Sequence, residues 1–128
     1  MNWLANTMNC SVPTTLATFS VGSGPTGLAF DGTNMWVVNQ SSNTVSKRKA
    51  SDATLEGMFP IGSGAVGIAF DGANMWITNS GNNNVYKLRA SDGEPLGAFP
   101  VGNSPYEVVF DGVNVWVANV GSGTVSKQ

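Results

Sequence analysis

A repeat of 40 residues is the feature that most constrains how this chain can fold. The tripeptide Phe-Asp-Gly at residues 30–32 returns at 70–72 and at 110–112, so equivalent positions are 40 residues apart. The units 21–60 and 61–100 align without a gap, and 101–128 follows the same pattern. A chain of this kind builds one small structural unit several times and packs each unit against its neighbours.

Short apolar runs alternate with turn residues inside each unit, which is typical of β-strands. In the first unit we expect strands at 27–30, 35–38, 44–49 and 55–59. Only 11% of the residues are charged and 41% are hydrophobic, a composition that fits neither a disordered chain nor a long helix. The sequence therefore predicts an all-β chain of four-stranded antiparallel sheets.

A four-stranded unit of about 40 residues has the size of a β-propeller blade, and such blades stack around an axis because one blade alone leaves both faces in water. The string Gly-x-Gly-Pro-x-Gly-Leu-Ala-Phe-Asp-Gly-x-Asn-x-Trp-Val-x-Asn at 22–39 recurs in related form at 62–79 and 102–119. It resembles the blades of the streptogramin (virginiamycin B) lyase-like and YVTN/NHL-type propellers. The resemblance implies the fold and no particular reaction, because similar blades occur in many binding proteins.

Three blades are fewer than the roughly four to eight of most propellers. Residues 15–20 resemble the last strand of a unit, and the third unit ends before its own last strand. We therefore expect residues 15–128 to form three blades, with 15–20 closing a neighbouring chain so that oligomerisation completes the ring. A six-bladed homodimer is the preferred interpretation, and the alternatives are a nine-bladed trimer and a piece of a longer propeller.

The first residues form a separate segment in this interpretation. Residues 1–6 align with 114–119, so we expect 1–14 to be a degenerate partial blade or N-terminal extension. The segment lacks the basic and apolar regions of a signal peptide, and no run in the chain reaches the ~18 apolar residues of a membrane span. The sequence indicates no particular cellular location.

The chain contains no histidine and one cysteine, Cys10. Catalytic systems that need histidine, and most zinc sites, are therefore excluded within the chain, and we expect no metal and no cofactor. A pI of about 4.7 argues against nucleic acid and anionic membranes as partners. The resembling lyase opens a lactone-linked antibiotic by elimination with a histidine base and a magnesium ion. This chain has no histidine for the role of that base, and Glu107 with Tyr106 is the one pair that could act as base and acid instead. We therefore expect that the protein is not an enzyme.

Several repeated residues are expected to be structural. Gly-x-Gly-x-x-Gly at 22–27 is not followed by a helix, so its glycines are expected to allow turns and close packing rather than to bind a dinucleotide. Asp31 and its equivalents Asp71 and Asp111 are expected to form Asx turns. The basic run 47–49 is expected on a solvated outer strand. Core packing between adjacent sheets is expected from the repeated aromatic residues, which are Trp36, Trp76, Trp116, Phe30, Phe70 and Phe110.

The repeats disagree most clearly at one place, which is the candidate ligand site. The pairs Thr26-Gly27 and Val66-Gly67 are replaced by Tyr106-Glu107 at the start of the innermost strand of the third blade. An aromatic ring beside a carboxylate at the mouth of a channel suits a ligand pocket. Each second strand also ends in an asparagine that either shapes the following turn or contacts a ligand. The candidate ligand-binding residues are Tyr106, Glu107, Thr26, Asn39, Asn79 and Asn119.

These observations favour a non-catalytic propeller scaffold or binding module that assembles into a closed ring. The loops near the channel mouth are rich in Ser, Asn and Gly, so a neutral polar ligand such as a carbohydrate or a peptide fits them best. Two alternatives remain, which are an enzyme that resembles the lyase and a propeller fragment whose only property is self-assembly.

Overall fold

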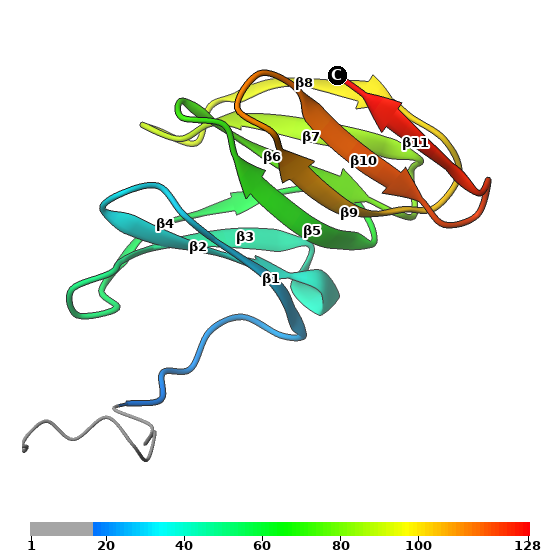
Figure 1. Ribbon diagram of the computed structural model, residues 1–128. Helices are drawn as coiled ribbons and strands as arrows, with labels where there is room; N and C mark the ends of the chain where they lie inside the picture. The colour runs from blue at the N-terminus through cyan, green and yellow to red at the C-terminus, as the bar shows by residue number, and fades with distance from the viewer. Residues whose placement is uncertain (1–16) are drawn as a thin grey trace, which may run out of the picture.

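The computed structural model describes residues 17–128, which form three antiparallel sheets packed in a row (Figure 1). The first sheet has the order β1-β2-β3-β4, the second β5-β6-β7-β8, and the third β9-β10-β11. The prediction of an all-β chain built from propeller-type blades is therefore confirmed. The strands are β1 (Pro25–Phe30), β2 (Asn34–Asn39), β3 (Thr44–Lys49), β4 (Leu55–Pro60), β5 (Ala65–Phe70), β6 (Asn74–Asn79), β7 (Asn84–Arg89), β8 (Pro95–Pro100), β9 (Pro105–Phe110), β10 (Val115–Asn119) and β11 (Thr124–Lys127).

The predictions for the N-terminal segment concern residues 1–20. Residues 1–16, which include the expected partial blade 1–14, lie outside the described residues. Residues 17–20 belong to no strand within the single chain. The expected partner of the segment 15–20 is another chain, so its strand stays a prediction. A single turn of 3-10 helix, η1 (Gln40–Ser42), is the only helical element among the described residues, and none of them forms a helix able to cross a membrane.

The hydrophobic core is divided between the two junctions of neighbouring blades. Strand β5 packs against both β1 and β9, so the second blade is covered on both faces. The first junction buries Trp36 and Val45 of the first blade against Ile68 and Met75 of the second. The second junction is built from a smaller set, in which the largest buried side chain is Trp76.

Each blade carries the same cluster of an aspartate, a tryptophan and a lysine. In the first blade Asp31 Oδ1 accepts the backbone N–H groups of Thr33 and Asn34, at 2.9 and 2.7 Å, which makes the expected Asx turn. Its Oδ2 also accepts the indole N–H of Trp36 at 2.9 Å. The Nζ of Lys47 lies 5.4 Å from the centre of that indole ring. The same contacts recur in the second and third blades, so the turn, the indole and the lysine are held as one unit.

Two features of this cluster differ from the expectations. Phe30, which was expected in the core, is 53% exposed, and the ring stacked on Trp36 is Phe59 of β4, with ring centres 5.7 Å apart. The solvated role expected for Lys47 is wrong, because its Nζ donates hydrogen bonds to the carbonyl groups of Ala90 and Ser91 in the second blade, at 2.9 and 3.2 Å. A lysine can cover an aromatic ring with its aliphatic stem while its ammonium group reaches polar atoms further away.

Hydrogen bonds to the turn aspartates lower their pKa values. For Asp31 and Asp71, partial burial raises the pKa, but the hydrogen bonds from the indole and from the turn outweigh burial, and the pKa lies below its ordinary value of 3.8. The backbone N–H of Asn114 and the indole of Trp116 lower the pKa of Asp111 from 3.8 to about 2. A lowered pKa in the folded state means that ionised aspartate stabilises the fold. This contribution is present above pH 3.8 and is lost as the pH falls towards 2.

We expect Asp71→Asn to lower the free energy of unfolding by about 1–2 kcal/mol at pH 7, because the amide keeps the turn but places a donor where the indole N–H needs an acceptor. The difference from the wild type should shrink as the pH falls below 3.8, since protonation weakens the same interaction in the wild type. Urea unfolding at pH 7 and at low pH measures both effects.

Asp52→Asn is the matched control, because Asp52 also accepts a turn N–H, from Thr54, and has no indole partner. An equal loss of stability in the two variants would show that the bond to the tryptophan contributes nothing.

Candidate functional site

Three of the predicted ligand-binding residues meet along the innermost strands. Thr26 of β1 lies near Tyr106 and Glu107 of β9, and all three line a pocket of about 280 Å³ that is shared with β5. The Thr26 hydroxyl donates a hydrogen bond to the carbonyl of Val66 at 2.8 Å, which links the first blade to the second. The Thr78 hydroxyl donates to the carbonyl of Tyr106 at 2.7 Å and links the second blade to the third.

Glycine at two positions lets the inner strands approach each other closely. A Cβ atom on Gly27 would lie 2.8 Å from the carbonyl oxygen of Val66, and one on Gly67 would lie 2.6 Å from that of Tyr106. Both distances are too short for a side chain, so the two internal junctions require glycine here. Glu107 occupies the equivalent position of the third blade, where no further blade follows within the described residues.

The side chains of Tyr106 and Glu107 are available to solvent. Tyr106 is 55% exposed, and no ion pair with Glu107 is present among the described residues. No lysine or arginine lines the pocket. A free carboxylate beside an aromatic ring can accept hydrogen bonds from a polar ligand that stacks on the ring. The described part of the chain holds no group of three or more side chains suited to bind a metal ion.

The three asparagines lie elsewhere, in the interior of their blades. Asn39, Asn79 and Asn119 are at most 1% exposed. Asn39 Nδ2 donates a hydrogen bond to the Ser46 hydroxyl at 2.8 Å, and Asn119 Nδ2 donates to Ser126 at 2.9 Å. They join the second strand to the third and do not line the pocket at the inner strands.

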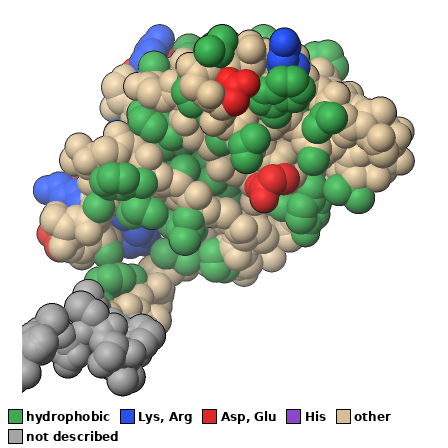
Figure 2. Space-filling view, in the orientation of Figure 1, with side chains coloured by type: hydrophobic (Ala, Val, Ile, Leu, Met, Phe, Trp, Pro, Cys, Tyr) green, Lys and Arg blue, Asp and Glu red, His purple; other side chains and the backbone are tan. Residues whose placement is uncertain are grey.

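A second exposed region emerges when equivalent positions of the repeat are compared. Leu28 is 66% exposed, whereas Ile68 and Val108 at the same position are 8% and 3% exposed. At the other end of the row Val125 is 64% exposed, whereas Val45 and Val85 are fully buried. The first and third blades thus each present a face that is buried everywhere else in the chain. Hydrophobic side chains also reach the surface in the view of Figure 2, where charged ones are few.

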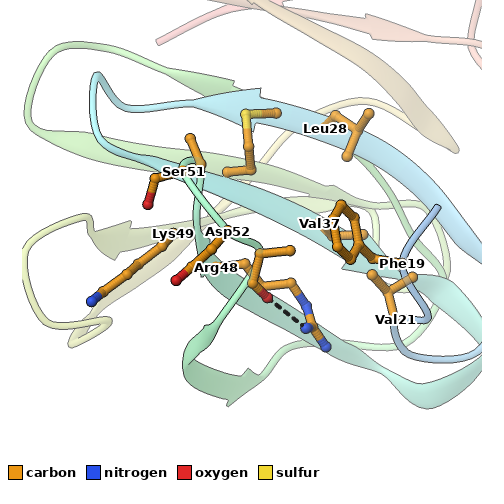
Figure 3. A pocket seen from close by; sticks show the side chains of 11 residues that line it. Phe19, Val21, Leu28, Val37, Arg48, Lys49, Ser51 and Asp52 are labelled. Atoms are coloured by element: carbon orange, nitrogen blue, oxygen red, sulfur yellow. Dashed lines mark hydrogen bonds between the residues drawn. The ribbon is translucent and has the colours of Figure 1, made fainter. Parts of the chain in front are cut away.

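The open face of the first blade is hollow. A pocket of about 260 Å³ is bounded by the apolar side chains of Phe19, Val21, Leu28 and Val37 and by the turn at residues 50–53 (Figure 3). Val37, which also lines the pocket, is 5% exposed. Arg48 lies at the edge of the pocket and donates a hydrogen bond to the carbonyl of Ala53 at 3.0 Å. Phe19 was expected in the closing segment 15–20 but no pocket was predicted here, although the alignment of Leu28 with the buried Ile68 and Val108 was a signal for an open face.

The fold is similar to several solved structures. A functionally unknown protein from Desulfotomaculum acetoxidans DSM 771 matches with a TM-score of 0.77 and 21% identity over 91% of this chain and 41% of that chain. Kuenenia stuttgartiensis hydrazine synthase matches with a TM-score of 0.71 and 21% identity, over 83% of this chain and 33% of that one. Myxococcus xanthus glutaminyl cyclase matches with a TM-score of 0.66 and 12% identity, over 77% of this chain and 43% of that one.

These similarities establish the class of fold. Hydrazine synthase and glutaminyl cyclase contain folds of the β-propeller type, so the three sheets are propeller blades. The chain spans between 33% and 43% of the length of these three structures. The sequence matches no protein-family model and no curated protein.

We expect Gly67→Ala to destabilise the fold by about 1–3 kcal/mol, because the new methyl group would press against the carbonyl of Tyr106 and force two blades apart. Urea unfolding measures the change. The matched control is Glu107→Ala at the equivalent position of the third blade, which should change the stability by no more than about 0.5 kcal/mol. Equal effects of the two substitutions would contradict the close approach of the inner strands.

Proposed function

We propose that this protein is a non-catalytic propeller module that works as a closed ring, and that two copies of the chain supply the six blades of that ring. The supporting observation is the contrast in burial at equivalent positions. Leu28 and Val125 are exposed, while their counterparts in the internal junctions are buried. A ring in which the third blade of one copy packs on the first blade of the other would bury both.

The two open faces differ from each other, so the proposed contact is head to tail. The third blade offers the face that contains Trp116 and Val125, which corresponds to the Trp36 and Val45 side of the internal junction. The first blade offers the face that contains Leu28, which corresponds to the Ile68 side. A head-to-tail contact forms a closed ring only when the rotations between copies add up to a full turn. Two copies give six blades, which is within the usual range of about four to eight.

The proposed function does not include catalysis. The activity implied by the lyase resemblance depends on a histidine base, and the chain contains no histidine. Glu107 and Tyr106 are the remaining candidates for proton transfer, but both side chains are open to solvent. A role in assembly and binding would use the exposed apolar faces of the first and third blades and the pocket at the inner strands.

We expect the wild-type chain to give a mass of two chains per particle in light scattering coupled to size-exclusion chromatography. Leu28→Asp should raise the dissociation constant of the dimer by about 100-fold or more, because each junction between copies would bury a charge in place of an apolar side chain. Leu28 is exposed in the single chain, so the fold of each copy should persist.

Leu96→Asp is the control for this experiment. Leu96 is 36% exposed on β8, in the second blade, whose two faces already pack against blades of the same chain, so its substitution should leave the mass unchanged. A wild-type chain that stays at one chain per particle would overturn the ring. A mass of three chains would replace the six-bladed ring by one of nine blades.

A second candidate function is the binding of a polar ligand or peptide at the inner edge of the ring. By the repeat, position 107 would face Thr26 of the second copy as Gly27 faces Val66 within the chain. Glu107 has a Cβ where both internal junctions require glycine, so the inner strands must stand further apart at this junction. The resulting slot would be lined by the Tyr106 ring and the Glu107 carboxylate.

We expect at least one of three neutral polar probes, maltose, cellobiose and triglycine, to bind the wild type in isothermal titration calorimetry. The double variant Tyr106→Thr with Glu107→Gly restores the residues of the first blade and should keep the mass while it loses the binding. If the variant binds equally well, or if none of the probes binds the wild type, this candidate function is wrong.

A further inference from the structure

Among the described residues the third sheet ends at β11, where the other two sheets have a fourth strand. We propose that residues 17–20 of a second copy form this fourth strand and place Phe19 against Trp116. This inference rests on the proposed ring and adds the segment that each copy exchanges. An exposed edge strand readily accepts another strand by main-chain hydrogen bonds.

The repeat specifies the register of the exchanged strand. In the first two blades Val45 is paired with Phe59, and Val85 with Phe99. The same spacing places Phe19 of the second copy opposite Val125. Val125 is the position that is fully buried in the other blades and 64% exposed here.

A backbone hydrogen bond after each fourth strand supports the same register. The N–H of Ile61 donates to the carbonyl of Asn43 at 3.0 Å, and that of Val101 donates to Asn83 at 3.2 Å. The equivalent donor is the N–H of Val21, and the equivalent acceptor is the carbonyl of Gly123, in the exposed turn before β11. The exchange would therefore repeat a bond that both complete blades already make.

The aromatic residues point to the same pairing. Phe59 stacks on Trp36 with ring centres 5.7 Å apart, and Phe99 lies against Trp76 at 5.8 Å. Trp116 has no stacked aromatic ring among the described residues and is partly exposed. Phe19 is 56% exposed and aligns with Phe59 and Phe99, so Phe19 of one copy is the equivalent ring for Trp116 of the other.

In the proposed ring, the lysine of the third blade meets backbone hydrogen-bond acceptors on the second copy. Lys47 bonds to the carbonyl groups of Ala90 and Ser91 across the first internal junction. Lys127 already lies over Trp116, with Nζ 5.5 Å from the ring centre. Its equivalent acceptors are the carbonyl groups of residues 50 and 51 of the second copy. This turn is exposed and borders the pocket that contains Phe19 (Figure 3).

A covalent cross-link tests the register directly. In a chain that carries Cys10→Ser, Phe19→Cys and Val125→Cys would stand opposite each other on two antiparallel strands, where Cα atoms are about 4.5–5.5 Å apart and a disulfide can form. We expect mild oxidation to give covalently linked dimers, seen by non-reducing electrophoresis. The matched control combines Thr18→Cys with Val125→Cys, because adjacent side chains of a strand point to opposite faces and this pair should not link.

A second measurement does not depend on cysteine chemistry. Phe19→Ala should raise the dissociation constant of the dimer, measured by analytical ultracentrifugation, by at least about tenfold, since the aromatic contact occurs in both junctions of the ring. Thr18→Ala should leave it unchanged. Trp116→Ala should weaken the dimer as well, and adding Phe19→Ala to it should cost much less than Phe19→Ala costs in the wild type.

The outcomes separate this inference from the proposed function. A dimer that forms no cross-link between positions 19 and 125, and whose dissociation constant is unchanged by Phe19→Ala, would overturn the strand exchange and leave the ring intact. A wild-type chain that remains at one chain per particle would overturn both.

Discussion

The burial of blade faces against one another is the interaction on which the rest of this structure depends. A four-stranded sheet of this composition has apolar side chains on both faces, and neither face is covered from within the blade. Both faces of the second blade are buried, because the first and third blades pack on its two sides. The first and third blades each have one buried face, and their other faces expose Leu28 and Val125 to water. Exposed apolar surface of this kind is typical of an interface.

The cluster of aspartate, tryptophan and lysine recurs in all three blades, and in the first blade it also contacts the next blade. The carboxylate of Asp31 holds both the turn after β1 and the indole of Trp36, so the position of the ring is tied to the local backbone. The lysine that covers the ring then reaches the carbonyl groups of the next blade. The hydrogen bonds of the turn therefore fix the indole ring, and the lysine on that ring contacts the neighbouring blade. A contact between copies can use the same parts, because the third blade carries them as well.

The sequence predicted the strands and the blade repeat well, because apolar alternation and turn residues act locally and recur in register. The partners of the aromatic residues were harder to predict. Phe30 is closer to Trp36 along the chain, but Phe59 is the ring that stacks on it, because the fourth strand returns beside the third. Lys47 was expected in solvent because a charged side chain on a single strand is usually exposed. Its hydrogen-bond acceptors belong to a different blade, which the sequence of that strand does not reveal. Of the candidate ligand residues, Thr26, Tyr106 and Glu107 do come together, while the asparagines are buried. Burial of a polar side chain depends on the packing around it, which residue type alone does not indicate.

The open faces also connect the stability of this chain with its concentration. A partner that binds only the folded form stabilises that form by mass action. If the partner is a second copy, the edge of β11 and the face around Leu28 are covered only while copies are associated, and dilution removes part of what holds each copy folded. The midpoint of thermal unfolding would then be a property of the solution as well as of the molecule. The middle blade, covered from both sides by its own chain, would be the part of the structure least sensitive to this change.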